Sequence, residues 1–245
     1  MNTPIKAIVT GHSRGLGAAI AARCLALGIP VLGLARRGNA ELLARYPDRL
    51  SEQAIDMADP TALAAWIDNG GLRAFCADAD TLLLVNNAGT LGPVGPIETQ
   101  PAAEIAAAVQ INVAAPLMLA GAAARDHAGE LRIVHISSGA ARSPYAGWSV
   151  YCATKAALDH HARAVAADGN PALRICSLAP GVVDTDMQTA IRATPEARFP
   201  LLKRFCQLKQ NGQLTLPDEA ARRIVDHALG GDFGKTPTAD LRELP

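Results

Sequence analysis

The sequence predicts a single α/β domain built on a doubly wound parallel sheet of about seven strands with helices on both faces, a three-layer α/β/α sandwich. Three observations predict this fold class. Short runs of Val, Ile and Leu alternate with longer Ala-rich stretches of helical periodicity along the whole chain. Several of these runs, such as residues 81–85, are almost entirely apolar, which suits strands covered on both faces. No repeat, linker or shift in composition divides residues 1–245, so one domain is expected.

Strands are expected at the short apolar runs and helices in the intervals between them. The expected strands are residues 7–10, 30–35, 50–55, 81–86, 131–137 and 173–178, with a short last strand at 238–241. The expected helices include residues 16–27, 101–124, 148–168 and 217–229. Residues 184–214 depart from this alternation and have a helical, partly basic middle at 198–204. We interpret them as a lid or substrate loop, although a structural helical pair or a subunit contact fits the same pattern.

Composition and charge exclude several classes of function. The chain has 23 Lys plus Arg and 23 Asp plus Glu, so we expect neither a nucleic-acid partner nor a membrane surface, but a small molecule. The five cysteines are scattered without a C-x-x-C pair, which favours reduced thiols and predicts no metal site. The start of the chain soon reaches an apolar strand and leaves no room for a signal peptide, so a cytoplasmic protein is expected. Polar residues and Pro116 interrupt the apolar stretch 102–124, so no membrane span is expected there.

A glycine-rich turn follows the first expected strand. The sequence Thr10-Gly-His-Ser-Arg-Gly-Leu-Gly17 leads directly into a helix. Glycines at this spacing permit a tight turn, close approach of the backbone to a pyrophosphate, and close packing of helix on strand. The first amides of the helix then point at anionic oxygens. The turn therefore predicts a dinucleotide site formed by Gly11, Ser13, Arg14, Gly15, Leu16 and Gly17, the alternative being a structural glycine turn.

The end of the second expected strand indicates which dinucleotide binds. A site for NAD usually has an acidic residue here, about 20 residues after the turn, to bind the adenosine ribose. This chain reads Leu34-Ala-Arg-Arg37 instead. We expect the guanidinium groups of Arg36 and Arg37, joined by Arg14, to bind the 2′-phosphate of NADP. The alternative is that these arginines are ordinary surface residues.

A tyrosine and a lysine are spaced for proton chemistry. Tyr151 and Lys155 lie four residues apart in an expected helix, so both side chains occupy one face. A nearby ammonium stabilises a phenolate and lowers the phenol pKa. Ser138, at the end of the fifth expected strand, could hydrogen-bond a substrate carbonyl oxygen beside Tyr151.

With these motifs in order, the chain resembles the short-chain dehydrogenase/reductase family in its single-domain, Rossmann-type form. The motifs that carry the resemblance span nearly the whole chain: the Gly11-Gly15-Gly17 turn, Asp56, Asn86-Asn-Ala-Gly89, Ser138 with Tyr151 and Lys155, and Pro180-Gly181 with Thr185. The resemblance implies that Tyr151 donates a proton to a carbonyl undergoing reduction and that Ser138 orients this carbonyl. It further implies that Lys155 lowers the Tyr151 pKa and binds the nicotinamide ribose, and that the backbone of Asn112 holds a water of a proton relay.

The resemblance also implies cofactor contacts elsewhere in the chain. Asp56 and Met57 match positions beside the adenine, while Asn87, Ala88 and Gly89 match the adenosine ribose side. The matching positions for the carboxamide and the phosphates are Pro180, Gly181, Val183 and Thr185. Taken singly, each has an ordinary alternative: Asp56 could cap a helix, and the other two motifs could be simple turns.

Two segments are similar to the sepiapterin reductase branch of the family, which includes bacterial benzil reductases. These are residues 147–155 and 179–188. The resemblance implies a substrate with adjacent carbonyls, and it matches Asp240 to a carboxylate that anchors a pterin; the alternative for Asp240 is a solvent-facing strand residue. Met187 is a further candidate for substrate contact. Trp148 could either line the substrate site or pack.

The predicted function is that of an NADPH-dependent carbonyl reductase acting on a small-molecule ketone, with a vicinal diketone as the expected substrate. Two alternatives are a non-catalytic NADP-binding sensor, which would not need the proton donor Tyr151, and an NAD-linked alcohol dehydrogenase, which the arginines after the second strand disfavour. The family resemblance implies a homodimer or homotetramer, paired through the helices that contain Asn112 and Tyr151.

Overall fold

A computed structural model describes residues 4–244; the two ends of the predicted domain, residues 1–3 and 245, lie outside the described residues. Seven strands form one parallel sheet in the order β3-β2-β1-β4-β5-β6-β7. The strands are β1 (Ile5–Thr10), β2 (Val31–Ala35), β3 (Leu50–Ala54), β4 (Thr81–Asn86), β5 (Glu130–Ile136), β6 (Leu173–Ala179) and β7 (Thr238–Asp240). The predicted doubly wound parallel sheet is confirmed.

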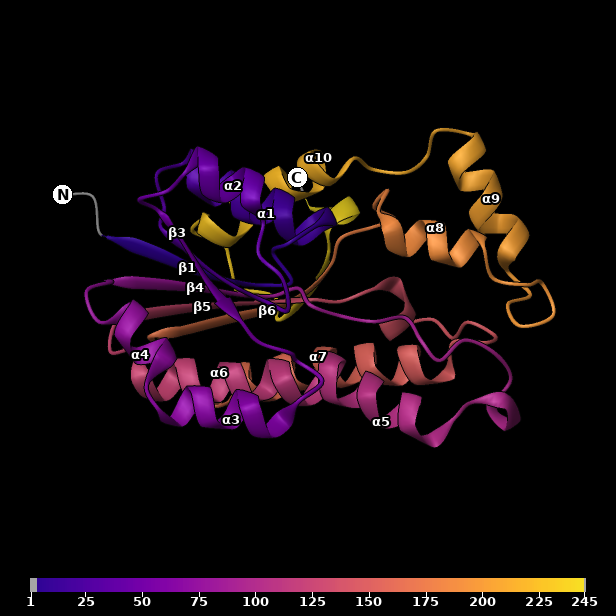
Figure 1. Cartoon of the computed structure of the whole chain (residues 1–245), viewed down its shortest axis with the longest axis horizontal. Helices are drawn as coiled ribbons and strands as arrows, with labels where there is room; N and C mark the ends of the chain where they lie inside the picture. The colour runs from indigo at the N-terminus through magenta and orange to yellow at the C-terminus, as the bar shows by residue number, and fades with distance from the viewer. Residues whose placement is uncertain (1–3, 245) are drawn as a thin grey trace.

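Helices cover both faces of this sheet (Figure 1). One face carries α1 (Gly15–Ala26), α2 (Ala40–Arg45) and α10 (Pro217–Leu229). The other carries α3 (Pro60–Asp68), α4 (Gly71–Cys76), α5 (Ala102–Val109), α6 (Ala115–Asp126) and α7 (Ser149–Ala167). Beyond the sheet lie α8 (Asp186–Arg192) and α9 (Leu202–Gln210), and short 3-10 turns occur at η1 (Ile97–Thr99), η3 (Gly139–Ala141) and η4 (Leu241–Glu243).

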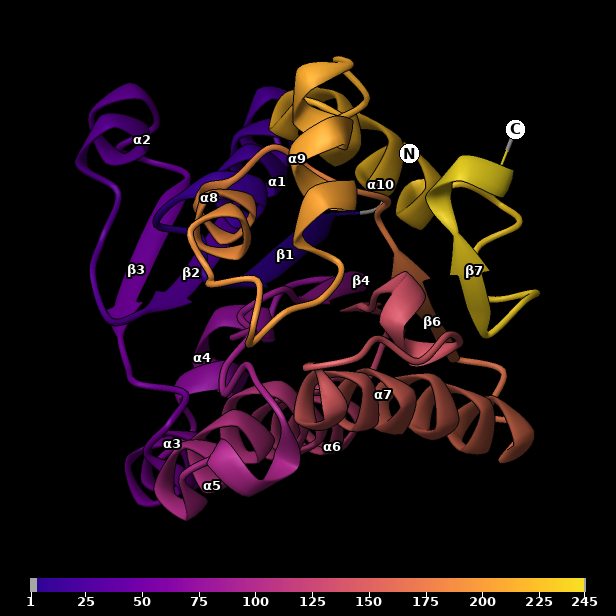
Figure 2. The same cartoon turned by 90° about the vertical axis from the view of Figure 1, so that its right-hand side faces the viewer.

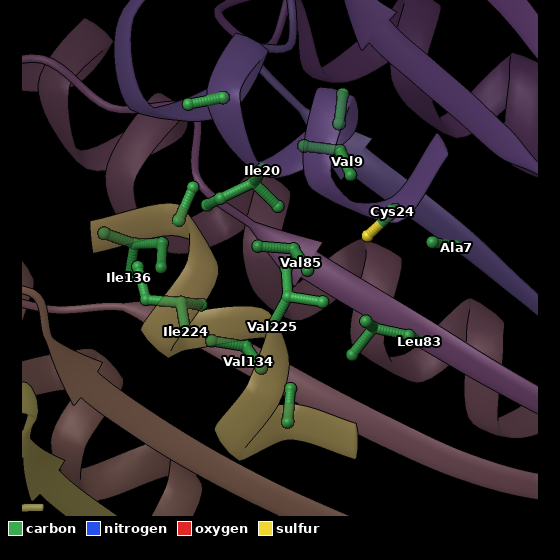
Figure 3. Packing of buried hydrophobic residues seen from close by; sticks show 14 of the residues in the cluster. Ala7, Val9, Ile20, Cys24, Leu83, Val85, Val134, Ile136, Ile224 and Val225 are labelled. Carbon is green, nitrogen blue, oxygen red and sulfur yellow. The ribbon is translucent and has the colours of Figure 1, made fainter. Parts of the chain in front are cut away.

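Apolar strands in the middle of the sheet form the core because helices exclude water from both of their faces. All six residues of β4 are buried, as the unbroken apolar run predicts. Ile20 and Cys24 of α1 pack with Val9 and Val85 on one face (Figure 3). Because β1 lies between β2 and β4, the chain crosses to opposite sides of β1, and a crevice for a ligand is expected at the carboxyl ends of β1 and β4.

The helix expected at residues 101–124 is interrupted in the structure. A π-helical turn, η2 (Gln110–Ala114), separates α5 from α6. Pro116 has no N–H to donate to the carbonyl of Asn112, four residues earlier, so a regular α-helix cannot close at this point. Residues 102–126 are long and apolar enough to cross a membrane by length and composition alone, a property that core helices of soluble proteins share. In this fold α6 packs on β4 and β5.

The segment 184–214 forms two helices, α8 and α9, beyond the carboxyl ends of the strands (Figure 2). This is the location expected of a lid. The helical middle expected at residues 198–204 is displaced, because α9 begins only at Leu202. Pro200 disfavours the helical conformation at Phe199, which explains the later start.

Candidate active site

The glycine-rich turn places backbone amides at the carboxyl end of β1. Gly11 has a φ of 71°, and a Cβ on Gly17 would lie 2.2 Å from the Gly11 carbonyl oxygen, so only glycine fits at position 17. No side chain caps α1, and its first turn contains no acidic residue. Its first N–H groups are therefore free to bind an anion, and the turn fits the pyrophosphate of a dinucleotide.

Thr10 joins the turn to the predicted Asn-Ala-Gly motif. Its Oγ1 accepts hydrogen bonds of 2.9 Å from the amides of Asn87 and Ala88, and its carbonyl accepts one of 2.9 Å from Asn87 Nδ2. The ends of β1 and β4 are thereby held together, as a site at this crevice requires. Thr10 is not among the residues predicted from the sequence, although a threonine that ends a buried strand directly before a glycine turn is a recognisable signal.

The loop after β6 reaches the same turn. Gly181 has a φ of 79°, and Val183 pairs with Thr215 in an isolated bridge. Thr185 lies against the glycine-rich turn, because a Cβ on Gly15 would be 3.4 Å from Thr185 Cγ2. The structure therefore brings Thr185, one of the predicted contacts after Pro180, to the glycine-rich turn.

Asp56 and Met57 lie beyond the end of β3. The Asp56 carboxylate accepts a hydrogen bond of 2.9 Å from the amide of Ala58, while Asp59 caps α3. The helix-cap alternative for Asp56 is therefore wrong. Met57 is buried, and its carbonyl accepts a hydrogen bond from Gln110 Nε2.

The charges around the turn differ from those expected. Arg36 and Arg37 are exposed beyond β2, but the Arg14 guanidinium, expected to join them, pairs at 2.9 Å with Asp186 of α8. An acid is also present, contributed by the neighbouring strand. Glu52 of β3 lies beside the turn, where its Oε1 is 2.7 Å from His12 Nε2 and accepts a 2.6 Å hydrogen bond from the Asn39 amide. Glu52 was not predicted from the sequence, because the acid of an NAD site is expected at the end of β2 and this one comes from β3.

The catalytic candidates lie where α7 packs against the end of β5. Tyr151 and Lys155 are both buried on α7, and the Lys155 ammonium is 5.7 Å from the centre of the Tyr151 ring. Lys155 Nζ donates a 2.7 Å hydrogen bond to the carbonyl of Ile136, the last residue of β5. Ser138 follows two residues later, and its hydroxyl lies close enough to the Tyr151 phenol to lower the phenol pKa. The structure thus brings together the three side chains predicted to act on a carbonyl.

Burial determines the proton affinities of this group. It raises the pKa of Tyr151 to about 12, against a smaller lowering by the nearby Ser138 hydroxyl. Burial lowers the pKa of Lys155 to about 8, partly opposed by the nearby Asp159 carboxylate. The lowered phenol pKa expected from the lysine is absent, since the desolvation of the phenol dominates. A phenol with a raised pKa stays protonated at neutral pH and can act as a proton donor.

Asn112 holds three segments together below these side chains. Its Oδ1 accepts a hydrogen bond from the Thr90 amide, and its Nδ2 donates to the Thr90 carbonyl, both at 2.8 Å. The same Nδ2 donates at 3.1 Å to Thr154 Oγ1 on α7. Gly89 is close to both catalytic elements, because its Cβ would be 3.3 Å from Asn112 Oδ1 and 3.6 Å from Lys155 Nζ. Asn112 therefore orders the loop after β4 against α7.

Aromatic side chains support the lid side of the site. Trp148 is 4% exposed and stacks on Phe199 with ring centres 4.6 Å apart. Trp148 also stacks on Tyr145, whose hydroxyl would be 3.9 Å from a Cβ on Gly139, next to Ser138. These contacts favour the packing alternative for Trp148, whose ring also lies edge-on to the Tyr151 ring with centres 5.6 Å apart. Met187 of α8 packs against the same cluster.

Asp240 is not the solvent-facing strand residue of the alternative reading. It is 4% exposed at the end of β7, where it pairs with Ala179 of β6. Arg242 hydrogen-bonds both oxygens of the Asp240 carboxylate. Its Nε donates to Oδ1 at 2.9 Å and its Nη2 to Oδ2 at 2.6 Å. The guanidinium holds the pKa of Asp240 below its usual range, so the carboxylate is ionised and already paired.

No group of three or more His, Cys, Asp or Glu side chains among residues 4–244 is arranged to hold a metal ion. All five cysteines are free thiols in this part of the chain.

Comparisons with known proteins agree with this architecture. A family model described as short chain dehydrogenase matches residues 6–196. A benzil reductase ((S)-benzoin forming) from Bacillus cereus is 34% identical over 226 residues, covering 89% of this chain and 91% of the relative. A sepiapterin reductase from Meriones unguiculatus is 35% identical over 240 residues, covering 89% of each protein.

Solved structures show the same fold. A short-chain dehydrogenase/reductase from Burkholderia vietnamiensis is 49% identical over the full length of both chains, with a TM-score of 0.72. A short chain dehydrogenase from Burkholderia cenocepacia, solved in complex with NADP, is 29% identical with a TM-score of 0.76, covering 97% of this chain and 95% of that one. The chain therefore belongs to the short-chain dehydrogenase family, oxidoreductases that use a nicotinamide cofactor on alcohol and carbonyl groups.

Proposed function

We propose that this protein is an NADPH-dependent carbonyl reductase that acts on a vicinal diketone of the benzil type. The observation that carries the proposal is the buried Tyr151 phenol, with the Ser138 hydroxyl close to it and the Lys155 ammonium one helical turn later. A proton donor, a second donor to the same oxygen and a fixed cation are the groups that ketone reduction needs.

The chain's own residues would hold the substrate and move the proton. Ser138 orients the carbonyl oxygen, and Tyr151 transfers its phenolic proton to that oxygen as negative charge develops there. The raised pKa of Tyr151 keeps this proton in place at neutral pH. Lys155 places positive charge below the phenol and would bind the nicotinamide ribose. Bound NADPH would supply the hydride.

The preference for NADP rests on the charges at the adenosine end. Arg36 and Arg37 are exposed and available to a 2′-phosphate. Glu52 could in principle bind ribose hydroxyls, as the acid of an NAD site does, but His12 and the Asn39 amide already occupy its Oε1. Asn87, Ala88 and Gly89 would line the adenosine ribose side. The NADP complex of the Burkholderia cenocepacia relative supports the same choice.

The preference for a diketone over a pterin rests on Asp240. An anchoring carboxylate must be free to accept hydrogen bonds from the pterin, whereas Arg242 already binds both oxygens of this one. Tyr145 presents an aromatic surface near Ser138, which suits an aryl ketone. Benzil reductases are among the relatives.

Substrate-dependent NADPH oxidation tests the proposal. The panel contains benzil, sepiapterin, simple aldehydes, quinones and a 3-ketoacyl thioester. We expect selective turnover of benzil. In Tyr151→Phe the rate of this turnover should fall by at least about a hundredfold while NADPH binding is retained. Tyr46→Phe is the matched control, because Tyr46 lies beyond α2 and should leave the rate unchanged. Full turnover by Tyr151→Phe would refute the acid role, and tight NADPH binding without turnover of any substrate would favour a non-catalytic sensor.

We also propose that the protein assembles as a homodimer or homotetramer through α5, α6 and α7. Within the helical segment 102–126, only 39% of the most apolar stretch is buried, and Val109 is 43% exposed. Such apolar surface is typical of a subunit interface. Light scattering should give two or four times the monomer mass, and Val109→Glu should shift the protein toward the monomer; a wild-type monomer contradicts this proposal.

A further inference from the structure

A buried carboxylate lies one helical turn beyond Lys155 on α7 and has no part in the reaction described above. Asp159 is 2% exposed and accepts hydrogen bonds from three side chains. Ser137 Oγ donates at 2.7 Å, Ser177 Oγ at 2.8 Å and Arg142 Nε at 3.0 Å. The carboxylate is therefore saturated with donors from outside its own helix.

Two of these donors flank Ser138. Ser137 directly precedes it, and Arg142 follows after η3, so one carboxylate holds both ends of the segment 137–142. The helix that carries this carboxylate also carries Tyr151. Asp159 thereby fixes the serine hydroxyl, which comes from the end of β5, relative to the phenol, which comes from α7.

The same carboxylate is the negative charge of the buried site. The titratable groups around Lys155 and Asp159 are His135 on β5, Arg142 after η3, Cys176 on β6, Tyr151 on α7 and, beside Arg142, Asp240 of β7 with its partner Arg242. Burial lowers the pKa of His135 to about 3 and raises the pKa values of Cys176 and Tyr151 to about 12, so these three are neutral at pH 7. Two cations, Lys155 and Arg142, then face Asp159, while Asp240 beside Arg142 is already paired with Arg242.

We propose that Asp159 is a positioning residue for carbonyl reduction, which clamps the Ser138 turn to α7 and supplies the negative charge that holds the Lys155 ammonium in its buried place. The inference rests on the proposed function, because it assigns Asp159 a part in the same reaction.

Asp159→Asn tests both parts, since it keeps the shape of the side chain and removes its charge. We expect kcat to fall by about tenfold to a hundredfold as the serine and the phenol lose their alignment. The alkaline limb of the kcat profile should move to lower pH by about one unit, because an ammonium without its counter-charge loses its proton more readily. Asp159→Glu restores the charge and should return the limb toward its original position.

Asp126→Asn is the matched control. Asp126 is also a buried carboxylate, with a side chain 2% exposed and paired with Arg73 and Arg125, but it lies at the far end of α6 against α4. A merely structural loss of a buried charge should therefore lower stability in both variants. Only Asp159→Asn should move the pH profile.

A titration of Lys155 separates failure of this inference from failure of the proposed function. The chain has five lysines, so the side-chain NMR signal of Lys155 can be assigned by comparison with Lys155→Met. Asp159→Asn should lower the Lys155 pKa whether or not any carbonyl substrate is found. An unchanged Lys155 titration in folded Asp159→Asn would overturn the inference, while a shifted titration without turnover would refute only the proposed reaction.

Arg142→Gln provides an independent variant in case Asp159→Asn does not fold. This variant removes the Arg142 charge, so that Lys155 is the remaining cation that interacts with the Asp159 carboxylate. The Lys155 pKa and the alkaline limb should then move to higher pH, opposite in direction to Asp159→Asn. No movement, or movement to lower pH, would contradict a charge role for Asp159.

Discussion

The Lys155 ammonium donates a 2.7 Å hydrogen bond to the Ile136 carbonyl and so fixes α7 to the end of β5. Ile136 lies two residues before Ser138 in the chain, so this contact brings the lysine close to that serine. It also buries a charge, because Lys155 is 5% exposed. The site therefore holds a cation in an environment that disfavours it, which gives a measurable conflict between stability and activity.

Lys155→Met should make the protein more stable and inactive. The difference between the usual lysine pKa of 10.5 and the value of about 8 in the fold corresponds to about 3 kcal/mol at neutral pH, offset by about 1 kcal/mol for the lost hydrogen bond. We expect a net gain of about 2 kcal/mol in urea unfolding at pH 7. Because the folded pKa is depressed, wild-type stability should rise between about pH 8 and 10.5, and the variant should lack this rise. A less stable variant would contradict the stated balance.

Gly17→Ala should abolish cofactor binding. The added Cβ would lie 2.2 Å from the Gly11 carbonyl oxygen and 2.4 Å from Asn87 Nδ2, so the turn must open. We expect a loss of about 1–3 kcal/mol in stability and of NADPH binding, measured by calorimetry. Gly121→Ala in α6 is the control, because its Cβ meets nothing within 4 Å and should stabilise the helix by about 0.5–1 kcal/mol. Normal NADPH affinity in Gly17→Ala would argue against the turn as the phosphate site.

Arg36→Ala should weaken NADPH far more than NADH, since only NADPH carries the 2′-phosphate. We expect the Michaelis constant for NADPH to rise by at least about tenfold and that for NADH to change little. Arg45→Ala removes another cation on α2, beside Tyr46, and should change neither value. Equal changes for the two cofactors in Arg36→Ala would refute the assignment.

His135 should make the protein sensitive to acid. It is fully buried between Asn86 and His161, and burial lowers its pKa to about 3. The unfolded chain takes up a proton near pH 6.5, so stability is fully present above that pH and is lost as pH falls toward 3. We expect about 2 kcal/mol to be lost between pH 7.5 and 5.

Denaturant unfolding of His135→Gln at the same two pH values checks this expectation, with the exposed His160→Gln as control. His135→Gln should lose most of the acid sensitivity, and His160→Gln should keep it. The same pH dependence in wild type and His135→Gln would mean that other groups cause it.

The order of strands and helices followed from the sequence because the apolar runs of a sheet buried on both faces are unmistakable. The interruption at η2 did not, since the Ala-rich segment has helical periodicity throughout and only the missing N–H of Pro116 breaks it. The catalytic set was predicted because Tyr151 and Lys155 lie on one helix and their spacing is local. Residues whose role depends on a distant partner escaped prediction.

The sequence by itself determined the fold class and the family, and it located the glycine-rich turn and the proposed proton donor, because each depends on short-range spacing within one strand, turn or helix. Only the tertiary structure decided the charges around them. It formed the side-chain pairs of Arg14 with Asp186, His12 with Glu52 and Asp240 with Arg242. It also placed the Asp159 carboxylate within hydrogen-bonding distance of Ser137, Ser177 and Arg142. Except for Asp240 with Arg242, these contacts join residues far apart in the chain, and burial, which sets the pKa values of Tyr151 and Lys155, exists only once the elements have packed.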